Sequence, residues 1–312
     1  MIVSAVNIGD EYGKRIEKET GDRLLYFNGL KEAAGSLPEA EIVISWGNFS
    51  SSYLKLCNKL KWLFTFSAGV EGLPFEELAQ RGIAVSNVRG IHGPQMAEQA
   101  FGMMIAFSRR LKECFENQHK NKWGNFETIG ELTGKSLTII GAGSIGMELA
   151  RKAKAFDMDV TGLKRNACAL PGFDRVWEMD RLHEALGISD YIVLLTPLTS
   201  ETRHLIGVEE FEAMKPGSVF INMSRGDVVD EDAMIDAIRK GRPAYAGLDV
   251  FKTEPLPEGS PLWGMDNVII TPHNAGQSPH YTERAVDIFI GAYSLYRQGM
   301  PLPNSIDLTR KY

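Results

Sequence analysis

Three side chains suited to acid–base and anion-binding chemistry follow apolar runs in the last third of the chain. Arg225 follows "VFINMS", Glu254 comes shortly after "AGLDV", and His273 follows "NVIITP". A histidine titrates near neutral pH, and a nearby carboxylate favours its protonated form and fixes its orientation. A guanidinium can hold a carboxylate and polarise a carbonyl group. Because ligands of open α/β sheets bind at the carboxyl ends of the strands, we expect these three residues to form one catalytic set.

A glycine-rich segment earlier in the chain has the spacing of a dinucleotide-binding loop. It reads "TIIGAGSIGMELARKAKAFDMDVTGLKRN" over 138–166 and contains G-x-G-x-x-G between a predicted strand and a predicted helix. The glycines permit a tight turn and a close backbone approach, and the helix offers free N–H groups to a pyrophosphate. The residues expected to bind the cofactor here are Gly141, Gly143, Ser144, Ile145 and Gly146.

The end of this segment is basic, where such segments usually end in an acid. Arg165 lies about 20 residues after Gly146, the distance at which an acid accepts hydrogen bonds from the ribose 2′-OH. A cation attracts a 2′-phosphate instead, and a guanidinium can bind it with two hydrogen bonds. Lys164 adds a second charge and Asn166 a further donor. These residues favour NADP(H) over NAD(H); the alternative is a strand end that is basic because it is exposed.

Short β-branched runs alternate with helical patterns along most of the chain, which indicates parallel sheets covered by helices. The predicted strands are 2–7, 23–28, 41–46, 62–67, 83–87, 137–140, 158–163, 190–196, 218–224, 244–250 and 267–272. One long helix is expected from Pro94 through residue 118, and another over 281–298. Because the first series is short and the chain ends in a lone helix, we expect that helix to pack on the N-terminal domain. The chain would then cross twice between two domains, with a cleft and a hinge between them.

Composition excludes several classes of partner. The net charge is −6, which argues against nucleic acid or an anionic membrane as the main partner. The N-terminus becomes polar too soon for a signal peptide, and no run approaches the roughly 18 apolar residues of a membrane span. The three cysteines are widely separated and have no metal-ligand spacing, so we expect no metal site and a cytoplasmic location.

Several motifs together resemble the D-isomer-specific 2-hydroxyacid dehydrogenases. They are "SAGVEGL", "ELTGKSLTIIGAGSIG", "LLTPLTSETRHLIG", "NMSRG", "GLDVF" and "TPHNAG", in the family's order. The resemblance implies an α/β fold of two doubly wound parallel-sheet domains with a cleft between them. The flavodoxin-like substrate domain would comprise residues 1–98 and 280–312, and the Rossmann cofactor domain residues 99–279.

The same resemblance assigns site residues. It implies that Arg225, Glu254 and His273 do the chemistry and that Asp249 lies near the nicotinamide carboxamide; the alternative for Asp249 is a strand-end residue that caps a turn. Further residues would line the cofactor trough, namely Thr196, Pro197, Met223 and Ser224. On the substrate side the resemblance points to Trp46, Gly69 and Val70, with Arg225. Trp46 is equally consistent with an ordinary buried indole. His92 could face the cleft, but a structural loop histidine is the preferred interpretation.

The activity implied is NADPH-dependent reduction of small 2-oxo acids, such as glyoxylate or hydroxypyruvate, to D-2-hydroxy acids. His273 would be the proton donor. Alternatives are a phosphoglycerate dehydrogenase or a dinucleotide-sensing, corepressor-like binding protein with the same fold. Formate or phosphite oxidation is disfavoured, because formate enzymes of the family carry Gln where this chain has Glu254. The helix "AEQAFGMMIAF" and the arm after it resemble the element through which relatives dimerise, which implies a homodimer.

Overall fold

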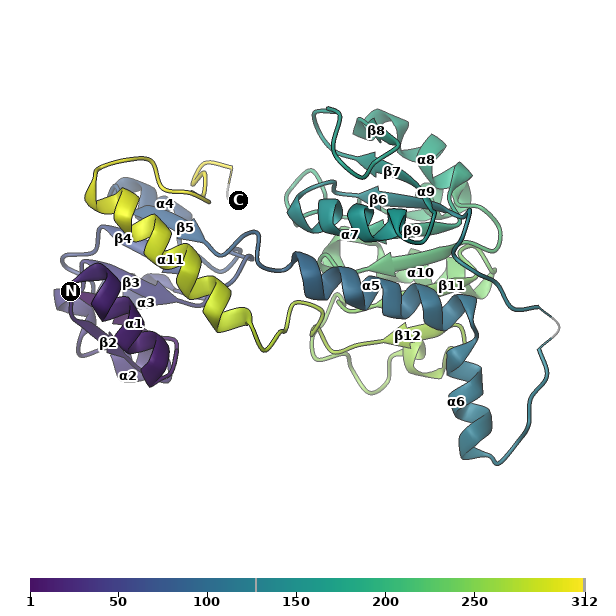
Figure 1. Cartoon of the computed structure of the whole chain (residues 1–312), viewed down its shortest axis with the longest axis horizontal. Coiled ribbons are helices and arrows are strands. Elements are labelled where there is room, and N and C mark those ends of the chain that lie inside the picture. The colour runs from purple at the N-terminus through teal and green to yellow at the C-terminus, as the bar shows by residue number, and fades with distance from the viewer. Residues whose placement is uncertain (127, 311–312) are drawn as a thin grey trace. The chain divides into compact units, whose positions relative to one another are not determined.

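The computed structural model describes residues 1–126 and 128–310 of the chain. They form two compact units, called here unit 1 (Met1–Ile91 with Ser278–Tyr312) and unit 2 (His92–Gln277) (Figure 1). Unit 1 is built from both ends of the chain, whereas unit 2 is continuous. The boundaries expected from the sequence lie at 98/99 and 279/280. In the structure the first falls after Ile91, because the helix that begins at Gly93 belongs entirely to unit 2.

Unit 1 contains one five-stranded parallel sheet in the order β2-β1-β3-β4-β5. Its strands are β1 (Ile2–Ser4), β2 (Leu24–Tyr26), β3 (Ile42–Ser45), β4 (Trp62–Thr65) and β5 (Ala84–Asn87). This order is the flavodoxin-like form of the doubly wound fold, which confirms the predicted architecture of this sheet.

Alternate strand residues of unit 1 point to opposite faces and build two cores. One face packs against α2 (Leu30–Ala33), α3 (Ser51–Leu54) and α4 (Phe75–Gln80). The other face packs against α1 (Asp10–Thr20) and α11 (Tyr281–Arg297). In that second core Phe289 of α11 stacks on Trp62 with ring centroids 5.3 Å apart. The C-terminal helix therefore supplies a central part of a core whose strands come from the N-terminal region.

Unit 2 contains a seven-stranded parallel sheet in the order β12-β11-β10-β9-β6-β7-β8. Its strands are β6 (Ser136–Ile140), β7 (Asp159–Leu163), β8 (Arg175–Trp177), β9 (Tyr191–Leu194), β10 (Val219–Asn222), β11 (Tyr245–Leu248) and β12 (Val268–Ile270). The strand order reverses between β6 and β9, the position at which doubly wound sheets bind dinucleotides. This is the Rossmann arrangement that the sequence predicts.

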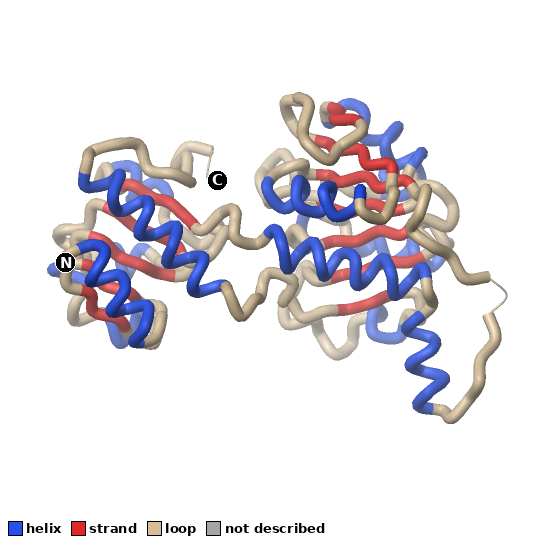
Figure 2. Tube along the Cα trace, viewed as in Figure 1, coloured by secondary structure: helices blue, strands red, loops and turns tan. Residues whose placement is uncertain are grey.

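Helices cover both faces of the seven-stranded sheet. On one face, α5 (Gly93–Ser108) and α7 (Ser144–Lys154) pack on side chains such as Leu137 and Ile139, and Figure 2 shows both helices crossing in front of the strands. On the other face, α8 (Leu182–Ile188), α9 (Val208–Ala213) and α10 (Glu231–Arg239) pack on side chains such as Ile140. The strands are buried on both faces, which explains their nearly continuous apolar character.

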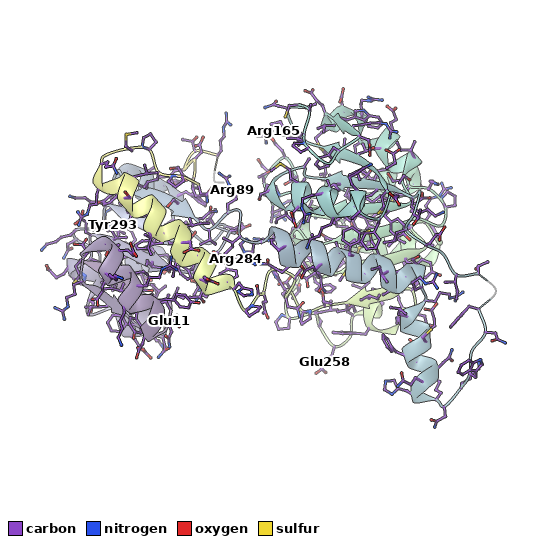
Figure 3. The ribbon with its side chains drawn as sticks, in the orientation of Figure 1. Glu11, Arg89, Arg165, Glu258, Arg284 and Tyr293 are labelled. Carbon is purple, nitrogen blue, oxygen red and sulfur yellow. The ribbon has the colours of Figure 1, made fainter. Side chains whose placement is uncertain are left out.

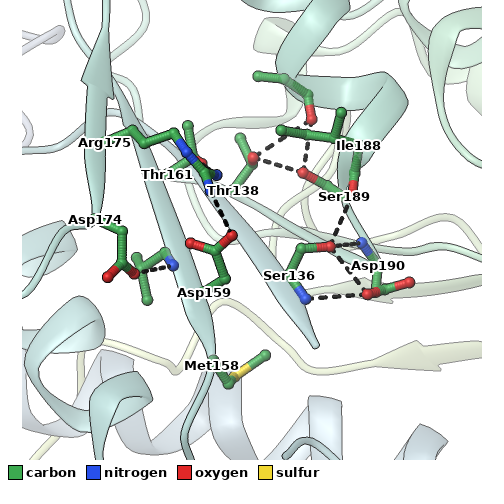
Figure 4. A network of polar contacts seen from close by, with 12 residues as sticks. Ser136, Thr138, Met158, Asp159, Thr161, Asp174, Arg175, Ile188, Ser189 and Asp190 are labelled. Atoms are coloured by element: carbon green, nitrogen blue, oxygen red, sulfur yellow. Dashed lines mark hydrogen bonds and ion pairs between the residues drawn. The ribbon is translucent and has the colours of Figure 1, made fainter. Parts of the chain in front are cut away.

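A polar network fixes the amino edge of this sheet, opposite the edge that carries the site (Figure 4). Asp190 Oδ2 accepts hydrogen bonds from the backbone N–H and the hydroxyl of Ser136, at 3.0 and 2.9 Å. Lys215 Nζ lies 2.5 Å from Asp190 Oδ1. Burial raises the pKa of Asp190, but the hydrogen bonds from Lys215 and Ser136 outweigh burial and leave the pKa lowered. The starts of β6 and β9 are thus held together by a charged group.

Two elements differ from the sequence prediction. The long helix expected over 94–118 is two helices, α5 and α6 (Leu111–His119), because Arg110 adopts a left-handed conformation with φ of 54°. The short strand β8 was not predicted, because three residues at a sheet edge carry too little pattern. Among the described residues, no helix combines the length and the apolar character needed to cross a bilayer.

Candidate active site

The glycine loop forms the tight turn between β6 and α7. Gly141 has φ of 103°, and a Cβ there would lie 2.9 Å from the backbone of Leu195 and Thr196. A Cβ on Gly146 would lie 2.8 Å from the carbonyl oxygen of Gly141. At both positions a side chain would collide with backbone, so only glycine lets the loop, the helix and β9 approach this closely.

The loop fits a dinucleotide on two observations. A Cβ built on Gly143 meets nothing within 4 Å, so the space above the start of α7 is open, and Gly143 gives that helix no side-chain cap. The hydroxyl of Thr196, at the end of β9, is buried and has no hydrogen-bond partner among the described residues. A phosphate above the loop would accept from the free N–H groups at the start of α7, and a bound ligand would give the Thr196 hydroxyl a partner. The backbone amides of Ser144 and Ile145 belong to this helix start.

The basic cluster lies at the carboxyl end of β7. Lys164 and Arg165 follow Leu163, the last residue of the strand, and Figure 3 labels Arg165 at the surface of unit 2. The Arg165 side chain is 54% exposed and pairs with Glu201, and Lys164 Nζ lies 3.5 Å from Cys168 Sγ. Asn166 is exposed beside them. The cluster therefore places two cations at the carboxyl end of β7, the strand that pairs with β6 before the glycine loop.

A histidine–carboxylate pair stands beyond β11 and β12. His273 Nδ1 is 2.6 Å from Glu254 Oε2, and Glu254 Oε1 accepts a hydrogen bond from the backbone N–H of Phe251 at 2.9 Å. The bond to a carboxylate places the proton on Nδ1 and leaves Nε2 directed elsewhere. The two side chains are 47% and 34% exposed, so the imidazole is reachable from solvent. This is the geometry of an oriented general acid or base.

Asp249 organises the loop that carries His273. Its carboxylate is buried and accepts hydrogen bonds from the Thr271 hydroxyl at 2.5 Å and from the backbone N–H groups of Asn274 and Ala275 at 3.0 and 3.1 Å. His273 itself has φ of 50°, an uncommon conformation for a residue with a side chain. Its backbone N–H donates to the carbonyl oxygen of Asp249 at 2.9 Å. The hydrogen bonds of Asp249 therefore match the turn-capping alternative considered for this residue.

Arg225 begins the loop after β10 and is held by its neighbours. Its Nη1 donates to the carbonyl oxygen of Ser224 at 2.8 Å, and Asn222 accepts from the Ser224 hydroxyl at 2.8 Å. The next residue, Gly226, has no room for a side chain, because a Cβ would lie 2.0 Å from the backbone of Phe251. The loops after β10 and β11, which carry Arg225 and Glu254, are thus packed backbone to backbone.

His92, for which the sequence favours a structural loop residue over one that faces the cleft, lies close to this set. It is 9% exposed, and a Cβ on Gly276 would approach its ring to 3.2 Å. Burial, together with a smaller contribution from the charge of Arg225, lowers the pKa of His92 to about 4. His92 is therefore a neutral imidazole beside the arginine. No spacing in the sequence connects residue 92 with residue 225, so sequence reasoning missed this proximity, and it missed the pairing of Glu201 with Arg165 for the same reason.

Two further residues predicted to line the cofactor trough, Met223 and Pro197, differ in solvent exposure. Met223 is 4% exposed and is part of the core beneath α5 and α7, so its side chain contributes packing. Pro197 is exposed at the end of β9, and its carbonyl oxygen accepts a hydrogen bond from the Thr202 hydroxyl. Both residues follow strands that end at the edge carrying the glycine loop.

The predicted substrate residues Trp46, Gly69 and Val70 lie in unit 1. Trp46 is 45% exposed, which is at odds with an ordinary buried indole, and its ring meets Phe66 edge-on at 6.2 Å. Val70 is buried in the unit 1 core, so its side chain contributes packing. A Cβ on Gly47 would lie 2.2 Å from the carbonyl oxygen of Gly69, so the two loops interlock through glycine.

Comparison with known proteins assigns the chain to a family. Residues 101–275 match the model for the NAD binding domain of the D-isomer specific 2-hydroxyacid dehydrogenases. Glyoxylate/hydroxypyruvate reductase B from Enterobacter sp. (strain 638) is 36% identical over 280 residues, which cover 85% of this chain and 83% of that protein. A family structure from Aeromonas salmonicida is 34% identical with a TM-score of 0.88 and covers 98% of both chains.

A second solved structure carries a cofactor. The D-isomer specific 2-hydroxyacid dehydrogenase from Xanthobacter autotrophicus Py2, in complex with NADPH and MES, is 28% identical with a TM-score of 0.86. It covers 100% of this chain and 99% of that one. The fold, the glycine loop and these matches agree: the chain belongs to the D-isomer-specific 2-hydroxyacid dehydrogenase family and is an oxidoreductase with a dinucleotide-binding domain.

Proposed function

We propose that the protein reduces small 2-oxo acids, glyoxylate or hydroxypyruvate among them, to D-2-hydroxy acids with NADPH. The observation that carries the proposal is the 2.6 Å contact between His273 and Glu254 in the same unit as the glycine loop. Reduction of a carbonyl requires a hydride at carbon and a proton at oxygen, so an oriented acid beside a dinucleotide site matches both needs. The similarity to a glyoxylate/hydroxypyruvate reductase supports the choice of substrate class.

His273 supplies the proton in this proposal. When bound, the nicotinamide supplies the hydride. Nδ1–H of His273 donates to the Glu254 carboxylate, and the proton on Nε2 passes to the carbonyl oxygen of the substrate as that oxygen gains negative charge. The hydrogen bond to Glu254 holds the imidazole ring in place for the transfer. The imidazole is neutral after transfer and regains its proton from solvent, to which it is 47% exposed.

Arg225 holds the substrate in this proposal. Its guanidinium donates from Nη1 to the Ser224 carbonyl, and its positive charge would bind the substrate carboxylate and polarise the carbonyl oxygen. That charge stabilises the developing oxyanion in the transition state. The substrate roles of Trp46, Gly69 and Val70, all in unit 1, stay predictions, as does the role of Asp249 beside the carboxamide.

The preference for NADPH over NADH rests on Lys164 and Arg165. Both follow β7, in the position where an acid would select a free 2′-hydroxyl. The family structure from Xanthobacter autotrophicus Py2 has NADPH bound, which supports this choice of cofactor.

A panel of 2-oxo acids tests the proposal. Glyoxylate, hydroxypyruvate, pyruvate and phenylpyruvate are each mixed with the protein and NADPH or NADH, and cofactor oxidation is followed. We expect turnover of the smaller acids with a higher kcat/KM for NADPH. Absence of oxidation with every acid and both cofactors would refute the reductase and favour a dinucleotide-sensing binding protein.

Two variants test the catalytic roles. His273→Ala should lower kcat by about 10²–10⁴-fold, the usual contribution of a proton donor. Arg225→Ala should raise KM and lower kcat together, because the arginine binds the substrate and stabilises the transition state. Near-normal turnover of His273→Ala would remove that residue from the mechanism.

A homodimer completes the proposal. Phe115 of α6 is 59% exposed, and Trp123 in the arm that follows is 94% exposed. Large apolar groups this open to solvent are typical of an interface. Light scattering of the protein and of Trp123→Ser measures the association: we expect a dimer that Trp123→Ser weakens, and a monomeric wild-type protein would contradict it. A cytoplasmic location stays a prediction.

A further inference from the structure

An acid from a neighbouring loop engages the arginine of the basic cluster. Glu201 lies between β9 and α9, and its Oε2 is 2.5 Å from Arg165 Nη2. The loop around Glu201 is itself fixed, because the Glu201 backbone N–H donates to the Thr199 hydroxyl and the Thr202 hydroxyl donates to the Pro197 carbonyl. The carboxylate is therefore presented to Arg165 by a hydrogen-bonded turn of the chain.

We propose that Glu201 is a specificity-determining residue that weakens binding of the 2′-phosphate by competing for the Arg165 guanidinium. This inference rests on the proposed role of Arg165 in NADP(H) binding. A guanidinium binds a carboxylate and a phosphate through the same fork of N–H groups. The N–H groups that face Glu201 can receive the phosphate only after the ion pair opens.

A second effect has the same direction. Once the pair opens, the Glu201 carboxylate remains beside a phosphate of the same charge sign, and like charges repel. NADH carries a neutral hydroxyl at this position, so neither effect acts on it. Glu201 therefore reduces the difference in binding affinity between NADPH and NADH.

The size of the effect follows from exposure. The Glu201 side chain is 70% exposed and that of Arg165 is 54% exposed, so solvent screens the pair and opening it costs little. Lys164 remains as a second cation beside the phosphate position. The competition is thus a modest adjustment of affinity and leaves NADPH binding intact.

Binding of two small nucleotides to the full chain tests the proposal without catalysis. The probes are 2′,5′-ADP, which carries the 2′-phosphate, and 5′-ADP, which lacks it, and calorimetry gives both dissociation constants. In Glu201→Gln, which keeps the shape and removes the charge, we expect the Kd for 2′,5′-ADP to fall about three- to tenfold. The Kd for 5′-ADP should stay within about twofold, because an exposed charge acts weakly at a distance.

Asp236→Asn is the matched control. Asp236 is 67% exposed in the same unit and pairs with Arg239, so its replacement removes the same charge away from Arg165. We expect neither Kd to change. In the Arg165→Ala background, Glu201→Gln should improve 2′,5′-ADP binding by clearly less than it does in the wild-type protein, because the competition acts only through Arg165 and the direct repulsion alone remains.

The outcomes separate the two proposals. An unchanged Kd for 2′,5′-ADP in Glu201→Gln would overturn the proposed competition. A higher Kd would also overturn it, because it would show that Glu201 orients Arg165 for the phosphate. An equal gain in affinity for 2′,5′-ADP from Asp236→Asn, or from Glu201→Gln in the Arg165→Ala background, would also overturn the proposal. The effect would then be one of net charge. Equal Kd values for the two probes in the wild-type protein would count against the proposed NADP(H) preference. The test of Glu201 is separate, because it compares the Kd of one ligand, 2′,5′-ADP, between the wild-type protein and Glu201→Gln.

Discussion

His92 makes the stability of unit 2 depend on pH in the mildly acidic range. Burial lowers its pKa from the ordinary 6.5 to about 4, with Arg225 contributing in the same direction. Below pH 6.5 residue 92 binds a proton in the unfolded chain but stays neutral in the folded chain. The free energy of unfolding therefore falls as the pH falls towards 4. A shift of this size is worth about 3 kcal/mol in total, of which about 2.5 kcal/mol is lost between pH 7 and pH 4.5.

Comparison with His92→Gln isolates this contribution. Carboxylates also titrate in this range, but they do so in both proteins, so the difference between wild type and variant reports residue 92 alone. At pH 7 we expect the variant to be the less stable protein, because glutamine cannot fill the space beside Gly276. At pH 4.5 the difference should shrink by about 2–3 kcal/mol or change sign, because glutamine carries no titrating proton.

The measurement must report unit 2 alone, because a chain of two units need not unfold in one step. Hydrogen exchange of peptides from β6 and β9, corrected for intrinsic exchange rates and measured in urea at several pH values, gives a free energy local to that unit. His119→Gln, at the exposed end of α6, removes a histidine from the same unit outside this pocket and is the control. A difference between wild type and His92→Gln that is constant from pH 7 to 4.5 would refute the reasoning.

Three other variants probe packing and polar contacts around the sheet. Gly226→Ala should lower kcat/KM by about 10²-fold or more, because the added Cβ would lie 2.0 Å from the Phe251 backbone and would displace the adjacent Arg225. Steady-state kinetics measure this loss, and a wild-type kcat/KM would contradict the prediction. Asp249→Asn should lower kcat about tenfold or more while the Kd for NADPH stays near the wild-type value, since it disturbs the His273 loop; a large loss of NADPH affinity instead would favour contact with the carboxamide. Asp190→Asn should destabilise unit 2 by about 1–3 kcal/mol at pH 7, and because the pKa of Asp190 is lowered in the folded state the difference should begin to shrink only below the ordinary value of 3.8 and close as the pH falls through the lower folded value. Hydrogen exchange of unit 2 peptides at pH 7 and across the range below about pH 4 measures both, and a difference that closes already above about pH 4 would contradict it.

The sequence predicted the architecture well, because apolar runs and glycine spacing are local signals. Each strand of unit 2 except β8 is an apolar run long enough to be recognised, and the glycine loop is defined by steric limits that only glycine meets. The break at Arg110 was missed, because nothing in "FSRRLKE" prevents a continuous helix, and the left-handed conformation of Arg110 has no local signal such as a glycine.

Part of the candidate site could not be predicted, because it depends on contacts between distant segments. The Glu254–His273 contact follows from two neighbouring parallel strands, so the motif order was sufficient to expect it. The positions of His92 beside Arg225 and of Glu201 on Arg165 depend on how loops of unrelated sequence fold over the sheet edge. Such contacts leave no spacing pattern in one sequence.

The discontinuity of unit 1 sets an order of completion during synthesis. All of unit 2 is translated before α11, whereas the aromatic core of unit 1 lacks Phe289 until that helix has been made. Domains generally fold as units while the chain emerges from the ribosome. Unit 2 can therefore fold while the N-terminal part of unit 1 still lacks its C-terminal helix. During that interval the ring of Trp62 lacks its stacking partner, and the newborn chain is most vulnerable to aggregation and to proteases at its amino-terminal sheet.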